Sequence, residues 1–144
     1  MSQAGFRWVC PRCGRHFKNP NQSHSCVKVS VDDHFGGRPP GRRATFDRLL
    51  EALRRFGPLN VDAVKTSISF GARAHFAGVQ VQRGALKLEF FLDRALSGGR
   101  IERVYPLGPT GLFCHVVKLR DPEEVDDELA DWLRRAYGLK SQGI

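Results

Sequence analysis

Hydrophobic residues recur at two different spacings along the chain, and the spacing changes where the predicted structure changes. Within residues 42–56 apolar side chains return every three or four positions, as on one face of an amphipathic helix, and Gly57-Pro58 interrupts the pattern. A second helical pattern follows Asp121, a favourable N-cap, and Pro122, a favourable first helical residue, and reaches Gly138. The apolar residues of the two predicted helices are Phe46, Leu49, Leu50, Leu53 and Phe56, and Val125, Leu129, Trp132, Leu133 and Ala136.

Between the predicted helices the hydrophobic period is two, which is typical of half-buried strands. We predict strands over residues 64–70, 74–82, 85–92, 101–105 and 112–119, and their short connections favour an antiparallel meander. The fold class is therefore predicted to be α+β, with an antiparallel sheet of about five strands and both helices packed on one face. The predicted organisation is a zinc-binding segment over 1–31, a linker over 32–41, the α+β domain over 42–138 and a tail over 139–144.

Four metal-ligating side chains lie close together near the N-terminus. Cys10 and Cys13 form a C-P-x-C-G turn, and ten residues separate this turn from His24, which is followed by Cys26. This spacing is typical of a zinc knuckle that holds one tetrahedral Zn²⁺. Because four protein ligands leave no open position, the predicted zinc is structural, and it would supply roughly 10 kcal/mol of folding free energy to a segment with few apolar residues.

His16 is an alternative fourth ligand, but it follows Cys13 within the tight turn, so we favour His24. Cys114 lies far downstream and is interpreted as a small core residue.

Cysteines gathered at a metal site, rather than paired as disulfides, favour a reducing compartment. The sequence has no apolar run of membrane-spanning length and no signal-peptide pattern at its N-terminus. We therefore expect a cytoplasmic protein with no membrane partner.

Basic residues are concentrated in the first part of the chain. The formal net charge is +8, and residues 1–57 contain eleven Lys and Arg against four acids. This distribution favours an anionic partner, although arginines spread over solvated faces would give the same composition. For a nucleic-acid partner we expect phosphate contacts from Arg7, Arg12, Arg15, Lys18, Arg43, Arg48, Arg54 and Arg55.

The motifs of several common enzyme classes are absent from the sequence. There is no G-x-x-x-x-G-K-[ST] phosphate loop, no H-E-x-x-H and no G-x-S-x-G. Cys114 and His115 are neighbours on one predicted strand, so their side chains point to opposite faces and do not form a nucleophile–base pair. We predict no catalytic residues.

Three polar residues on or near the predicted strands are candidates for an anion site, namely Lys65, Arg73 and His115. His115 alternates with apolar residues, so a core histidine satisfied by a hydrogen bond is the competing interpretation. His34, beside two acids, is either a ligand or base, or a solvated or capping residue.

Together these motifs resemble a bacterial family of domains of unknown function, numbered 5655, in a small form with an N-terminal zinc segment. The resemblance covers nearly the whole chain. It rests on W-x-C-P-x-C-G from Trp8, Phe17, Gln22 to Cys26, Asp33-His34-Phe35, Lys65-Thr66-x-Ile68-x-Phe70-x-x-Arg73, Phe76-Ala77-x-Val79, His115, Leu119-Arg120-x-Pro122 and the Trp132 helix.

The resemblance implies a nucleic-acid context, because related domains occur attached to predicted nucleases and DNA-processing proteins. It also implies that His24 is a ligand and that Lys65, Arg73 and His115 form a shared polar group. This sequence departs from the family pattern after the Phe76 strand, where 81–83 contains a single basic residue. The resemblance therefore gives no phosphate-binding role to Gln82 or Arg83.

These observations leave three interpretations of function. The principal one is a non-catalytic, zinc-stabilised module that binds nucleic acid through its basic N-terminal half. The second is an adaptor for a protein partner, stabilised by zinc. The third is a phosphate or nucleotide site on the sheet, with or without catalysis, built on Lys65, Arg73 and His115.

A Cys13→Ser substitution tests the zinc segment. Because the metal supplies the folding free energy of that segment, we expect the variant to lose zinc and unfold locally while the sheet domain keeps its structure. Metal analysis together with amide chemical shifts would measure both effects. Loss of the whole fold would instead make the segment part of the core.

Overall fold

The computed structural model describes residues 8–17, 19–21 and 29–141. A short hairpin, β1 (Trp8–Val9) and β2 (His16–Phe17), precedes the main domain. The main domain contains two α-helices, α1 (Pro40–Arg54) and α2 (Asp127–Ser141), and one antiparallel sheet. The strands of this sheet are β3 (Asn60–Ala63), β4 (Ile68–Gly71), β5 (His75–Val81), β6 (Leu86–Leu92), β7 (Ile101–Pro106) and β8 (Phe113–Leu119).

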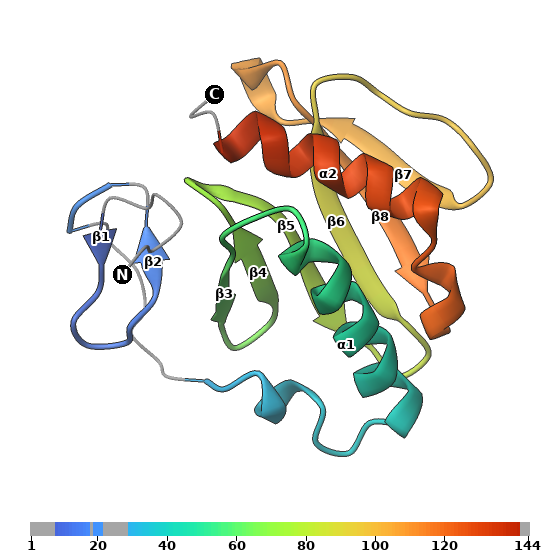
Figure 1. Cartoon of the computed structure of the whole chain (residues 1–144), viewed down its shortest axis with the longest axis horizontal. Helices are drawn as coiled ribbons and strands as arrows, with labels where there is room; N and C mark the ends of the chain where they lie inside the picture. Colours follow the sequence, from blue (N-terminus) through green and yellow to red (C-terminus); the bar gives the residue numbers. More distant parts are fainter. Residues whose placement is uncertain (1–7, 18, 22–28, 142–144) are drawn as a thin grey trace.

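The predicted α+β arrangement is confirmed, since both helices cover the same face of the sheet (Figure 1). Alternate residues of the central strands face the helices and are fully buried, as the two-residue period requires. The core between the layers contains the side chains of Phe46, Leu49, Leu53, Phe70, Phe90, Leu129 and Leu133. Burial of these apolar groups is the main source of folding free energy.

The six-stranded sheet has one strand more than predicted, and the predicted strand over 64–70 is wrong in its first half. Residues 64–67 form a turn in which the Val64 N–H donates to the Ser67 carbonyl at 2.8 Å. The additional strand, β3, escaped detection because two of its four residues, Asn60 and Asp62, are buried although polar. Its pattern therefore lacks the apolar alternation that marks the other strands.

The strand order β3-β4-β5-β6-β8-β7 shows that the predicted meander is wrong at its end. β8 lies between β6 and β7 and is antiparallel to both. Five of the seven residues of β8 are buried, whereas β7 is partly or fully exposed along its length. The more apolar strand takes the inner position, and the strand with Glu102 and Arg103 takes the edge, where charged residues are tolerated.

Both helix boundaries near 121–141 differ from the prediction. Asp121 and Glu124 form a capping box around the short 3₁₀ helix Pro122–Glu124, not around α2. The carboxylate of Asp126 then accepts the Leu129 N–H at 3.0 Å, so α2 begins six residues after the predicted cap. The helix continues through Gly138 to Ser141 because Gly138 does not adopt a left-handed conformation.

Because β6 and β7 run in the same direction on either side of β8, residues 93–100 must return along the sheet to begin β7. His115 holds this connection in place. Its ring is fully buried and stacks on Phe90, its Nδ1–H donates to the Phe113 carbonyl at 3.2 Å, and its Nε2 accepts the Leu96 N–H at 3.0 Å. These bonds require a neutral ring, and burial lowers the pKa of His115 below its ordinary value of 6.5.

The pH dependence of unfolding tests this role of His115. In the unfolded chain the ring gains a proton near pH 6.5, while in the folded chain it stays neutral to lower pH, so stability is full above pH 6.5 and falls below it. The loss approaches about 1.4 kcal/mol per pH unit until the folded pKa is reached. We expect His115→Gln to remove this component in urea unfolding measured from pH 7 to pH 5. Identical slopes for the two proteins would contradict the assignment.

Candidate functional site

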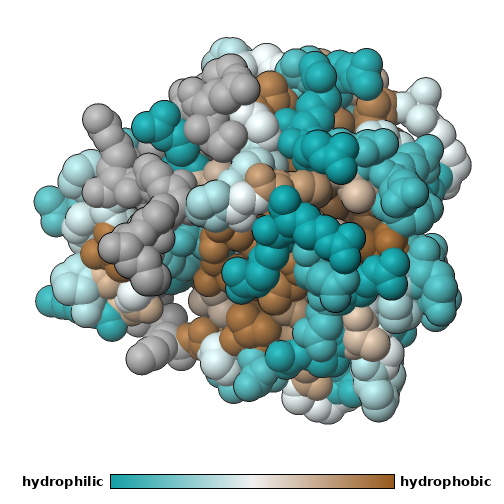
Figure 2. Space-filling view, viewed as in Figure 1, coloured by the Kyte–Doolittle hydropathy of each residue, from teal (hydrophilic) through white to brown (hydrophobic). Residues whose placement is uncertain are grey.

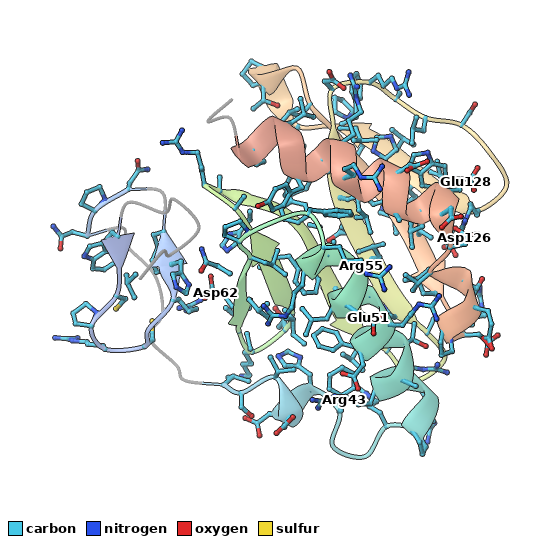
Figure 3. All side chains as sticks on the ribbon, in the orientation of Figure 1. Arg43, Glu51, Arg55, Asp62, Asp126 and Glu128 are labelled. Atoms are coloured by element: carbon cyan, nitrogen blue, oxygen red, sulfur yellow. The ribbon has the colours of Figure 1, made fainter. Side chains whose placement is uncertain are left out.

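The N-terminal hairpin is joined to the main sheet through a buried carboxylate. Asp62 on β3 is 5% exposed, and its Oδ1 lies 2.7 Å from Nδ1 of His16 on β2. Its Oδ2 lies 3.3 Å from Nε2 of His75 on β5, and Figure 3 shows Asp62 pointing from β3 toward the hairpin. Burial alone would raise the pKa of Asp62, but the hydrogen bonds from His75 and His16 outweigh it and hold that pKa below 3.8.

Two of the predicted zinc ligands, Cys10 and Cys13, lie on the hairpin. Gly14 follows them with φ of +74°, a conformation that favours glycine, and its N–H donates to the Cys10 carbonyl at 2.8 Å. Cysteine sulfur is a preferred ligand of Zn²⁺, so both side chains suit metal ligation. The other two predicted ligands, His24 and Cys26, lie outside the described residues, and the described part of the chain contains no complete group of metal ligands.

The predicted arginine face of α1 is partly neutralised. Arg43 lies 2.6 Å from Asp32 and 3.1 Å from Asp47, and Arg55 lies 3.0 Å from Glu51, as Figure 3 shows for the last pair. Arg48 and Arg54 are exposed on the same helix. Half of the predicted phosphate contacts on α1 are therefore already engaged by carboxylates.

The remaining predicted contacts belong to the N-terminal segment. Arg12 is exposed in the cysteine turn, whereas Arg15 is half-buried and lies over the ring of Phe17, 5.6 Å from its centroid. Arg7 and Lys18 lie outside the described residues. The hairpin thus presents a basic group beside the cysteines, while the second described arginine contributes to packing.

Lys65, Arg73 and His115 do not come together. Lys65 lies in the turn before β4 and Arg73 in the turn after it, so the two basic groups are at opposite ends of that strand. His115 is buried beneath the helices and occupied by its own hydrogen bonds. The structure therefore does not bring these three residues into one pocket, because the alternation of β8 turns His115 into the core.

Lys65 instead lies in a hollow of about 580 Å³ at the end of the sheet where β5 finishes. Two segments that are thirty residues apart meet at this hollow, the one with His34 and the one with Lys65. They are held together by a contact of 2.6 Å between Nε2 of His34 and the Val64 carbonyl. Its polar lining consists of Asp33, His34, Arg38, Lys65, Thr66, Gln80 and Gln82. We call this feature the His34 hollow.

A second, smaller hollow of about 190 Å³ shares Gln82 with the first and is also lined by Lys118 and Arg120. Between the two hollows, Gln80 pairs with Lys87, and Lys87 pairs with Lys118, in a row across the face of the sheet opposite the helices. We call the joined surface the basic groove, defined by Arg38, Lys65, Gln80, Gln82, Lys87, Lys118 and Arg120.

The charges of the basic groove are only slightly compensated. Lys87 forms no ion pair with any residue that the structure describes, and Glu102 approaches Lys118 only to 4.0 Å. Arg42 adds a guanidinium beside the groove, where it donates to the carbonyls of Arg83 and Arg120 at 3.2 and 3.1 Å. Two lysines directly opposite each other repel and destabilise the sheet.

Sequence reasoning missed the basic groove because strand order brings its residues together. Arg38, Lys87, Lys118 and Arg120 are separated by many residues, and none belongs to a motif with a fixed spacing. The one available signal was the alternation of Lys87 and Lys118 with apolar residues on strands predicted over 85–92 and 112–119. That signal places both lysines on the outer face of the sheet but gives no indication that the strands are neighbours.

A small polar cluster lies farther along the same face. The Tyr105 hydroxyl donates to Oε2 of Glu89 at 3.2 Å, and Sγ of Cys114 lies 3.8 Å from the same oxygen. Cys114 is 1% exposed, and burial is the main cause that raises the pKa of its thiol. The thiol is therefore shielded and unreactive, as expected of a structural cysteine.

One comparison with known proteins found a family whose match spans the main domain. The sequence model of a family described as Domain of unknown function (DUF5655) matches residues 31–140. The chain belongs to this family. The DUF5655 match contains both helices, the six-stranded sheet and the basic groove, whereas the hairpin lies outside it.

No curated protein and no solved structure matches the chain. In the described part of this DUF5655 protein, neither α-helix has the length and apolar character of a transmembrane span. The function must therefore be inferred from the surfaces of the domain itself.

Replacing Asp62 tests the junction between hairpin and sheet. Asp62→Asn removes the charge that strengthens the bonds to His16 and His75, so we expect about 1–3 kcal/mol of destabilisation and faster hydrogen exchange in the hairpin. Asp47→Asn is the matched control, because its ion pair with Arg43 is exposed and should contribute less than about 1 kcal/mol. Equal effects of the two substitutions on urea unfolding would contradict the proposed junction.

Proposed function

We propose that this protein is a non-catalytic nucleic-acid-binding module whose phosphate contacts centre on the basic groove. The observation that carries the proposal is the pairing of Lys87 with Lys118 on neighbouring strands, continued by Lys65, Arg38 and Arg120 around the two hollows. The repulsion between these cations costs stability in the unbound protein. A row of phosphates lying along the groove would relieve it and release counterions, which favours binding.

The basic groove is a better phosphate surface than the outer face of α1. Carboxylates already hold Arg43 and Arg55, so binding there would have to break existing ion pairs. The groove presents its cations on several strands and turns, an arrangement that follows an extended backbone more closely than a single helix face does. Arg12 of the hairpin and the exposed Arg48 and Arg54 would add weaker, longer-range attraction.

A structural Zn²⁺ held by Cys10, Cys13, His24 and Cys26 is part of the proposal. The tight turn that holds the first two cysteines supports it, because their spacing suits a shared metal ion. Bound zinc would hold the N-terminal segment in one conformation, and Asp62 would fix the hairpin against the sheet. A cytoplasmic location, where thiols stay reduced, is consistent with these assignments.

A protein partner is the second candidate. Figure 2 shows hydrophobic surface beside α1, between the hydrophilic outer face of the helix and the hairpin side of the molecule. Partly buried apolar residues that pack around the core include Phe35, Leu50, Leu59, Val61 and Ala63. Purification from cells with and without nuclease treatment separates the candidates, because a protein partner survives the nuclease and a nucleic acid does not.

Neutralising the central lysine pair tests the proposed function. For Lys87→Gln/Lys118→Gln we expect weaker binding to all nucleic acids, and a slope of log affinity against log salt that is smaller by about two. The control is Arg48→Gln/Arg54→Gln, which removes the same charge from α1 and should change both quantities much less. Fluorescence anisotropy over a series of salt concentrations measures them.

A larger effect of the α1 variant would contradict the groove as the interface. Failure of the unmodified protein to bind DNA or RNA at low salt would contradict nucleic-acid binding altogether. The lysine variant should also be slightly more stable than the unmodified protein, because the repulsion across the strands is removed.

A further inference from the structure

The His34 hollow differs in chemistry from the rest of the basic groove. Besides two cations it contains an aromatic ring, a carboxylate and two side-chain amides, namely His34, Asp33, Gln80 and Gln82. A site for phosphate alone would not place a carboxylate among its groups, because like charges repel. The hollow is therefore built for a ligand that has hydrogen-bond donors as well as negative charge.

The ring of His34 is held in a fixed position. A carbonyl can only accept, so the contact of 2.6 Å with the Val64 carbonyl places a proton on Nε2. The bond ties the ring to the turn that carries Lys65 and Thr66, and the half-buried ring lines the hollow. A fixed aromatic ring beside cations is a typical stacking surface for an unpaired base.

The carboxylate of Asp33 is also oriented. The Ser30 N–H donates to its Oδ2 at 3.0 Å, and the Asp33 N–H donates to the Ser30 hydroxyl at 3.2 Å. The hydrogen bonds from Ser30 lower the pKa of Asp33, so it is ionised at neutral pH and accepts hydrogen bonds only. Its natural partners are therefore adjacent N–H groups, such as N1–H and the N2 amino group of guanine.

We propose that the His34 hollow binds one unpaired nucleotide of a single strand, with its base against His34 and Asp33 and its phosphate near Arg38 and Lys65. This inference rests on the proposed function and adds the class of nucleic acid. A volume of about 580 Å³ lies within the range of small-molecule sites, and a nucleotide fits that range. A base within a duplex already uses its Watson–Crick edge and has both faces stacked, so it cannot enter.

The base preference follows from the groups in the hollow. Guanine offers two adjacent donors to the Asp33 carboxylate, whereas thymine and uracil present a single ring N–H between two carbonyl acceptors. One bidentate contact to a base contributes a discrimination on the order of tenfold or more. A strand with a single guanine should therefore bind better than a strand of thymidine or uridine alone.

The test measures the fluorescence anisotropy of labelled ten-nucleotide single strands, as DNA and as RNA. One strand of each kind contains only thymine or only uracil, and the other contains one central guanine in the same background. A duplex of equal length is measured beside them. The unmodified protein should prefer the guanine strand by roughly tenfold. Asp33→Asn should abolish this preference. His34→Gln keeps a donor for the Val64 carbonyl but removes the ring, so it should weaken single-strand binding roughly tenfold while leaving duplex binding unchanged.

Retained duplex binding also shows that both variants are folded. Equal affinity for single strands and duplex, or unchanged behaviour of both variants, would overturn the unpaired-nucleotide site and leave the basic groove as a phosphate surface. Absence of binding to any of these nucleic acids would overturn the proposed function and this inference together.

Discussion

The burial of β8 on both faces is the constraint on which the rest of the structure depends. Because its residues are too apolar for an edge, β8 inserts between β6 and β7 and forces residues 93–100 to return along the sheet. Arg135 fixes that connection to α2 through Asp93, and Arg100 fixes its end through Asp126 and the Glu124 carbonyl. The same insertion brings Lys118 opposite Lys87, so the basic groove exists only with this strand order.

The sequence was sufficient for those features that depend on near neighbours along the chain. The apolar spacing of α1 and the alternation in β5, β6 and β8 follow from local geometry, and the structure agrees with each of them. β3 was missed because Asn60 and Asp62 are buried although polar, and Asp62 is stabilised by His16, a partner distant in sequence that no local pattern reveals. Polar residues buried for such reasons are the expected failures of pattern-based prediction.

The candidate site was predicted less completely than the fold for the same reason. Lys65 lines the His34 hollow, but the two residues predicted to accompany it do not. Arg73 is at the other end of β4, and His115 satisfies the Leu96 N–H in the core. The residues that do surround Lys65 come from the segment before α1 and from the end of β5, and only the folded chain brings them together.

The bridge from His16 to Asp62 also links the N-terminal hairpin to the domain that the family model describes. The hairpin lies outside the family match, but the carboxylate that anchors it lies within. Loss of the hairpin would remove the closer of the two histidines that contact Asp62 and leave His75, at 3.3 Å, as the other. The hairpin and this one carboxylate of the domain therefore depend on each other for a hydrogen bond.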